Sequence, residues 1–149
     1  PLARAVRIDK LCLAALEAVL RLYLQPERAV REVPVLAMLT EEPERLRARA
    51  EELARRLAQD LPGWQVRVEE GHASQAGGGS LPGVELPTAV VALQGPLPAV
   101  ETERRLRAAS PPVIARIHRE QVLLDLRTVL PHQDALLARQ VAAALGAGS

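Results

Sequence analysis

Aromatic residues are nearly missing from this chain of 149 residues, which has no phenylalanine, one tryptophan (Trp64) and one tyrosine (Tyr23). Leucine, valine and alanine must therefore build the core. A single cysteine, Cys12, excludes a disulfide framework and fits a reducing compartment, and we expect its side chain to be a small buried hydrophobe. No apolar run reaches the roughly 18–20 residues that a membrane-spanning helix needs, so we expect no membrane partner.

A dominant charge is lacking as well, since 19 basic residues face 18 acidic ones and the net charge is +1. No strong field therefore draws the chain toward nucleic acid or membrane. Lys10 is the only lysine, and we attribute the excess of arginine mainly to coding bias and only in small part to bidentate anion contacts. The length is enough for one domain with a sizeable core. Because the first residues resemble the interior of a larger protein, we expect residues 1–149 to be a single domain of a fragment.

The usual catalytic and metal-binding patterns are also lacking. His72, His118 and His132 lie apart without ligand spacing, so we expect no metal site. Ser80 stands in no Gly-x-Ser-x-Gly turn. The neighbouring glycines are followed neither by Lys-Ser/Thr nor by a helix start, which excludes the common nucleotide-binding loops. No catalytic residue is therefore assigned in this chain.

The most distinctive stretch that is present is the glycine- and proline-rich segment 77–87. Its consecutive glycines permit close backbone approach, while Pro82 and Pro87 fix φ and favour extended geometry before them. The segment is either a plain connection between elements or a surface that shapes a binding site. Gly79 and Ser80 are its candidate site residues.

Hydrophobic periodicity predicts the order of elements. Helical spacing covers residues 9–24, 42–61, 100–109 and 134–145. Strands are predicted over 64–70, 88–93, 113–117 and 122–127, with a tight turn near 118–121 that joins the last two as a hairpin. Polar residues 27–32 are expected to form a loop or a short turn. This order predicts an α+β fold, in which a mixed or antiparallel sheet carries helices on one face.

Three arginines are the candidate binding residues. Arg4 and Arg7 lie three apart before the first helix, where they either clamp an anion with two planar guanidinium groups or belong to a solvated face. Arg116 lies in an apolar strand and needs an acidic partner or an anionic ligand. Asp125 on the neighbouring strand is the candidate partner for a cross-strand ion pair.

Several segments together resemble one family, and they occur in the order that the family has. They include Arg4-Ala5-Val6-Arg7-Ile8-Asp9-Lys10-Leu11, Gly78-Gly79-Ser80-Leu81-Pro82-Gly83-Val84-Glu85-Leu86-Pro87, Pro112-Val113-Ile114-Ala115-Arg116-Ile117 and Leu123-Leu124-Asp125-Leu126-Arg127-Thr128-Val129. The chain resembles the C-terminal domain of bacterial selenocysteine synthase, the L-seryl-tRNA(Sec) selenium transferase.

The resemblance implies a small C-terminal domain of a pyridoxal-phosphate enzyme with the aspartate-aminotransferase-like fold (fold type I). Such an enzyme converts seryl-tRNA(Sec) to selenocysteinyl-tRNA(Sec), uses selenophosphate as donor, and is expected in the cytoplasm as a homo-oligomer. The cofactor lysine belongs to the large domain upstream, so residues 1–149 alone should bind no cofactor and be inactive.

For individual residues the resemblance implies less. Arg4 and Arg7 match the arginine pair that holds the anionic selenium donor, whereas Arg116, Gly79 and Ser80 are weaker candidates that face the active site. Two alternatives stay open. One is the small domain of a related pyridoxal-phosphate enzyme that acts on a free amino acid, and the other is a non-catalytic interaction module with the same fold.

Overall fold

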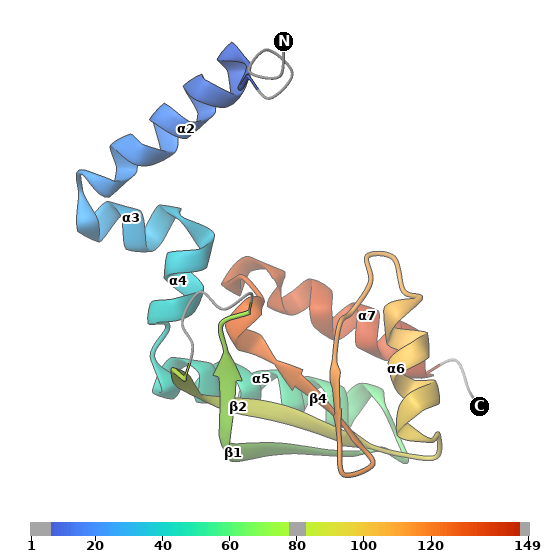
Figure 1. Ribbon diagram of the computed structural model, residues 1–149. Coiled ribbons are helices and arrows are strands. Elements are labelled where there is room, and N and C mark those ends of the chain that lie inside the picture. Colours follow the sequence, from blue (N-terminus) through green and yellow to red (C-terminus); the bar gives the residue numbers. More distant parts are fainter. Residues whose placement is uncertain (1–6, 78–82, 147–149) are drawn as a thin grey trace. The chain divides into compact units, whose positions relative to one another are not determined.

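The computed structural model describes residues 7–77 and 83–146. Contacts divide the chain after Thr40 into two compact units, one that ends there and one that begins at Glu41 (Figure 1). The assignment of residues 1–149 to one domain of a longer protein stays a prediction. Across the described residues, no helix is both long enough and apolar enough to cross a bilayer.

The first unit contains three described helices: α2 (Lys10–Tyr23), α3 (Pro26–Glu32) and α4 (Pro34–Thr40). Asp9 caps α2, because its Oδ1 accepts hydrogen bonds from the backbone N–H groups of Leu11 (2.7 Å) and Cys12 (2.9 Å). The helix predicted over residues 9–24 is thereby confirmed.

Helix α3 corrects the loop or short turn that the sequence predicted over residues 27–32. Pro26 occupies the first helical turn, where its missing N–H costs nothing, and Glu27 adds an acidic side chain there. Arg28 and Glu32 form an ion pair of 2.6 Å one turn apart. Pro26 therefore follows one helix directly and begins the next.

The second unit carries a four-stranded sheet with the order β1-β2-β4-β3, antiparallel throughout (Figure 1). The α+β prediction is confirmed, and so is the hairpin, whose turn places Arg119 and Glu120 at positive φ. Its elements are α5 (Pro43–Asp60), β1 (Gln65–Gln75), β2 (Glu85–Gln94), α6 (Ala99–Arg107), β3 (Arg116–His118), β4 (Gln121–Asp125), η1 (Leu126–Thr128), η2 (Pro131–Gln133) and α7 (Asp134–Gly146).

Two strands are longer than the sequence predicted. The register of β1 against β2 shifts between Glu69 and His72, around Gly71 at φ +78°. This irregularity lets β1 continue beyond its expected end to Gln75. Strand β2 begins at Glu85 and pairs Leu86 with Ser74, so part of the predicted loop 77–87 is strand.

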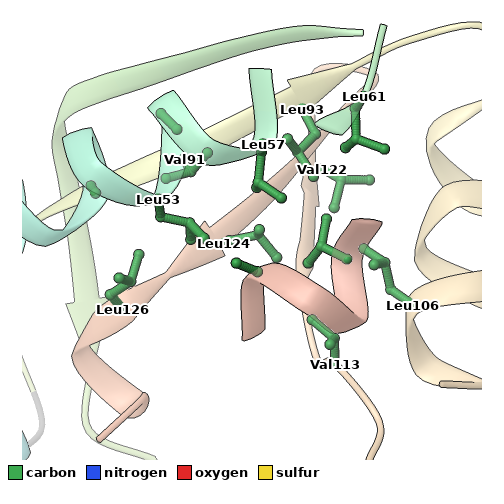
Figure 2. Packing of buried hydrophobic residues seen from close by; sticks show 14 of the residues in the cluster. Leu53, Leu57, Leu61, Val91, Leu93, Leu106, Val113, Val122, Leu124 and Leu126 are labelled. Atoms are coloured by element: carbon green, nitrogen blue, oxygen red, sulfur yellow. The ribbon is translucent and has the colours of Figure 1, made fainter. Parts of the chain in front are cut away.

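The core lies between one face of this sheet and helices α5, α6 and α7, as the sequence predicted (Figure 2). Because side chains alternate along a strand, Val91 and Leu93 on β2 point to the same face of the sheet. Their partners on β4, Leu124 and Val122, point to that face as well. Full burial of each large side chain contributes about 1.5–3 kcal/mol. The cluster includes Leu46, Leu53, Leu57, Val91, Leu93, Leu106, Val122, Leu124 and Val141.

Gly95 lies directly against the indole ring of Trp64, just after β2. A Cβ atom added there would come within 2.3 Å of the ring atom Cδ2. We therefore expect Gly95→Ala to lower the free energy of unfolding of the second unit by about 2 kcal/mol, since one of the two groups must shift. Urea denaturation followed by Trp64 fluorescence measures this change. Gly77→Ala is the control, because a Cβ atom meets nothing within 4 Å there, and equal midpoints for the two variants would contradict the prediction.

Candidate functional site

The candidate site residues predicted from sequence fall in different parts of the chain. Arg4, Gly79 and Ser80 lie outside the described residues. Arg7 belongs to the first unit, where its side chain is exposed two residues before the cap of α2. Arg116 belongs to the second unit and lies on β3. The donor-binding role of Arg4 and Arg7 therefore stays a prediction.

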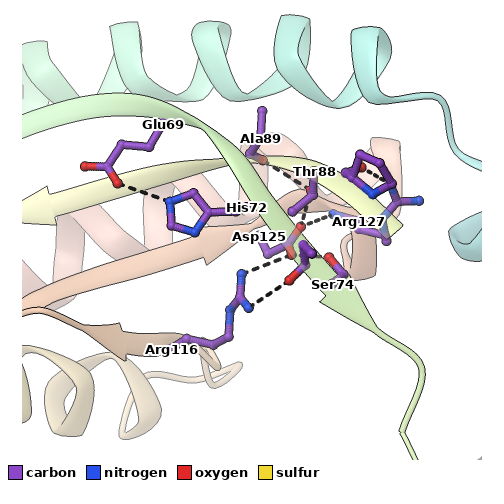
Figure 3. Close-up of polar contacts among 10 residues, drawn as sticks. Glu69, His72, Ser74, Thr88, Ala89, Arg116, Asp125 and Arg127 are labelled. Atoms are coloured by element: carbon purple, nitrogen blue, oxygen red, sulfur yellow. Dashed lines mark hydrogen bonds and ion pairs between the residues drawn. The ribbon is translucent and has the colours of Figure 1, made fainter. Parts of the chain in front are cut away.

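Around Arg116 the structure gathers a polar cluster on the sheet face opposite the core (Figure 3). We call this the second face. Its centre is apolar, because Val90, Ala92 and Leu123 are buried and form a cluster of their own. The strand register places longer side chains beside them: Glu69 and Asp125 flank Val90, while Arg67 and Arg116 lie in line with Ala92 and Leu123. Polar residues thus frame a small apolar strip.

Asp125 is the hub of this cluster, since its carboxylate accepts hydrogen bonds from groups on all four strands or their ends (Figure 3). Oδ1 accepts from Thr88 Oγ1 on β2 (2.9 Å) and from the backbone N–H of Arg127 after β4 (3.0 Å). Oδ2 accepts from Ser74 Oγ on β1 (2.5 Å) and from Arg116 on β3 (3.5 Å). One carboxylate therefore ties the strands together at this end of the sheet.

The cross-strand ion pair predicted for Arg116 is confirmed. Its guanidinium lies 3.5 Å from Asp125 Oδ2 and also donates to the carbonyl oxygen of Ala73 at 3.4 Å. Both distances are long, and 47% of the Arg116 side chain is exposed. The acidic partner accounts for the position of this arginine, while its exposed edge still faces water and can donate to a further acceptor.

Two histidines that are distant in sequence meet on the second face. His72 lies on β1 and His118 lies on β3. Their ring centroids are 6.1 Å apart, and the two ring planes are nearly perpendicular. His72 Nε2 also lies 3.2 Å from Glu69 Oε2 (Figure 3). Since β1 and β3 are the outer strands, the two rings reach toward each other across the middle of the sheet. Sequence spacing could not reveal this pair, and among the described residues no group of three or more side chains is arranged to hold a metal ion.

Arg127 has a structural role that the sequence did not predict. It is only 5% exposed, and its guanidinium donates to the carbonyl oxygens of Pro87 (2.6 Å) and Glu41 (3.1 Å). These bonds join the beginning of β2 to the residues before α5. A charged residue inside the apolar run that follows β4 is the signal that would have indicated a buried anchor.

The second face is built for positioning more than for covalent chemistry. Ser74 donates directly to Asp125, and His72 contacts Glu69 instead of Ser74. A serine nucleophile needs a base that takes its proton and a third group that orients the base. Within the part of the chain that the structure describes, the cluster lacks this relay. Instead, the hydrogen bonds to Asp125 hold Arg116 in position and tie together β1 and β2, the strands on either side of residues 76–84.

Comparison with known proteins identifies the kind of chain this is. The family model described as L-seryl-tRNA selenium transferase matches residues 1–130. Proteins named L-seryl-tRNA(Sec) selenium transferase are similar: that of Moorella thermoacetica is 50% identical over 97% of this chain and 31% of its own length. That of Aquifex aeolicus is 46% identical over 90% of this chain and 29% of its own length. That of Geobacter sulfurreducens is 48% identical over 87% of this chain and 28% of its own length. The chain thus spans less than a third of these relatives.

Proposed function

Because the chain belongs to the L-seryl-tRNA selenium transferase family, we propose that it is the C-terminal domain of an enzyme that converts seryl-tRNA(Sec) to selenocysteinyl-tRNA(Sec). The match of the family model over residues 1–130 carries this proposal. The relatives are all longer than this chain, so the activity belongs to the full-length protein and residues 1–149 alone should be inactive.

Within that enzyme, Arg4 and Arg7 are proposed to bind selenophosphate, the anionic selenium donor. Helix N-termini often hold phosphate groups through free backbone N–H groups. At α2, however, the side chain of Asp9 already accepts from the N–H groups of Leu11 and Cys12. An anion beside this helix must therefore rely on side chains. Guanidinium groups suit that task, since each can donate two parallel hydrogen bonds to a phosphate-like group.

Pyridoxal phosphate is proposed as the cofactor of the full-length enzyme, but the residues of this chain do not fit it. The cofactor is held through a Schiff base to a lysine. The only lysine here is Lys10, which lies exposed in the first turn of α2. A lysine that forms a Schiff base is ordinarily desolvated or placed beside another cation. We therefore assign the cofactor to the large domain outside this chain.

The partners proposed for the domain follow from the same assignment. They are the large pyridoxal-phosphate domain of its own polypeptide, seryl-tRNA(Sec) and further copies in a homo-oligomer, in the cytoplasm. The nearly balanced charge of residues 1–149 gives them no electrostatic preference for RNA. Contacts with the tRNA backbone are therefore expected mainly from the rest of the protein.

An assay of the full-length protein tests this function. Supplied with pyridoxal phosphate and labelled selenophosphate, it should transfer selenium to seryl-tRNA(Sec). We expect no transfer to free serine mixed with deacylated tRNA, and none by residues 1–149 alone. Transfer to free serine would favour the enzyme that acts on a free amino acid, and no transfer to either substrate would favour an interaction module.

A further inference from the structure

Helix α2 is apolar around most of its circumference, yet none of its residues is buried. At about 100° per residue, Lys10, Glu17 and Arg21 fall on one narrow stripe, and apolar residues fill the rest. Leu11 is 83% exposed and Leu20 is 55% exposed. A helix that is apolar nearly all round is normally buried in the native protein. Among the described residues of its own unit, nothing therefore covers this helix.

One row of side chains marks the face that needs this cover. Leu13, Leu16 and Leu20, with Leu24 just after the helix, follow one another at intervals of three and four residues. We call them the leucine row. All four are exposed, and together with Lys10, Glu17 and Arg21 they line a shallow apolar hollow. Soluble proteins rarely leave a continuous apolar patch of this kind in water unless something binds there.

We propose that the leucine row of α2 packs against the part of the full-length protein that lies outside this chain. This inference rests on the proposed function, because it assumes that the chain is part of a longer transferase. The family match includes the residues of α2, and the chain spans only 31% of the Moorella thermoacetica relative. About two thirds of such a polypeptide is thus available to cover the helix.

The charges on α2 favour this occupant over a second copy of the helix. Pairing between identical helices is usually specified by charged residues that flank the apolar row and reach across to the partner. Here Glu17 and Arg21 pair with each other on the same helix at 2.7 Å. The stripe therefore offers little that selects another α2, whereas the broad apolar surface fits a groove in a larger domain.

Cys12 provides a reporter at the edge of the leucine row, one turn before Leu16. It is exposed, so the buried position that the sequence predicted is wrong for this structure. Its thiol donates to Asp9 Oδ2 at 3.2 Å, and this hydrogen bond raises the pKa of the thiol. A domain seated on the leucine row would also shield Cys12, which would give it the buried environment that its apolar neighbours indicate.

The test compares the alkylation rate of Cys12 in two proteins, residues 1–149 alone and the full-length protein. N-ethylmaleimide is the probe, and mass spectrometry of the peptide that contains Cys12 gives the rate. We expect the full-length protein to react at least about tenfold more slowly, because a covered thiol reacts only when the interface opens. Leu20→Glu in the full-length protein should restore the rate of the shorter chain. Glu27→Gln, at an exposed position on α3 that does not line the hollow, is the control and should keep the protection.

A milder variant and a folding check keep the test decisive. Leu20→Ala should restore the alkylation rate of Cys12 in part, and circular dichroism shows whether either Leu20 variant still folds.

Equal alkylation rates in the full-length protein and in residues 1–149 would overturn the proposal. It would also be overturned if the shorter chain were protected at every concentration, which indicates cover by its second unit. Protection that grows with concentration would instead indicate a second copy, and would overturn it too. The assay needs no turnover, so its failure is distinct from failure of the proposed function.

Discussion

The double variant Arg4→Ala/Arg7→Ala is expected to lower kcat/KM for the selenium donor by about 100-fold or more in the full-length protein. Each guanidinium that binds a charged group by hydrogen bonds contributes roughly 1.5–3 kcal/mol. Loss of two such contacts therefore removes about 3 kcal/mol at least, and each 1.36 kcal/mol is about a factor of ten in rate. Initial rates of selenium transfer over a range of selenophosphate concentrations measure the effect.

The chain supplies a closely matched control for this variant. Arg28 and Arg31 are also exposed and three residues apart, but they lie on α3, where Arg28 pairs with Glu32. Arg28→Ala/Arg31→Ala removes the same charge and should leave kcat/KM for the donor within about twofold, as surface ion pairs contribute little. Arg7→Lys should fall between the wild type and Arg7→Ala, because lysine keeps the charge and loses the planar pair of donors.

Inorganic phosphate adds a second readout of the same site. As an anion of similar shape, it should compete with selenophosphate in the wild-type protein and compete less well in the double variant. If Arg4→Ala/Arg7→Ala left both the donor KM and the inhibition by phosphate unchanged, these arginines would belong to a solvated face. That was the other interpretation of their spacing.

Asp125→Ala is expected to lower the free energy of unfolding of the second unit by about 3 kcal/mol. The substitution removes the acceptor for Ser74, Thr88, Arg116 and the backbone N–H of Arg127. Thr88 is 4% exposed, so its hydroxyl loses this partner at a site with little access to water and keeps only the long contact with the carbonyl oxygen of Ala89 at 3.5 Å. A buried donor left without a partner costs about 1–3 kcal/mol, and the more exposed Arg116 adds little.

Trp64 makes this prediction measurable in the complete chain. As the only tryptophan it lies in the second unit, so its fluorescence during urea denaturation follows that unit alone. Asp60→Ala is the matched control, because Asp60 is exposed at the end of α5 and its loss should change the free energy of unfolding by no more than about 0.5 kcal/mol. A loss of less than about 1 kcal/mol for Asp125→Ala would show that the carboxylate does not hold the strands together.

Local patterns in the sequence predicted most of the fold. The helices at Lys10–Tyr23 and Pro43–Asp60 follow from apolar spacing and from the residues at their ends, and the hairpin of β3 and β4 follows from its tight turn. These features depend on residues within a few positions of one another. Two of the differences have local causes as well, since Pro26 begins a helix at residues that were predicted as a loop or a short turn, and the register shift around Gly71 lengthens β1.

The candidate site could be predicted only in part. Arg116 and Asp125 lie on strands that a short turn joins, so their ion pair could be inferred from spacing. Ser74 and Thr88 are 51 and 37 residues from Asp125 and reach it only through the order of the strands. The contact between His72 and His118 depends on the whole sheet in the same way. No local pattern records which distant strands become neighbours.

The sequence by itself determined the family resemblance, the α+β class and the helices and turns, because periodicity, caps and turn residues act over short distances. Only the tertiary structure decided that one carboxylate, Asp125 on β4, gathers donors from the other three strands, and that Arg127 anchors β2 beside the start of α5. It also decided that α2 is uncovered within its own unit although its composition is that of a buried helix. Burial and convergence depend on packing between distant segments, which one-dimensional spacing does not specify.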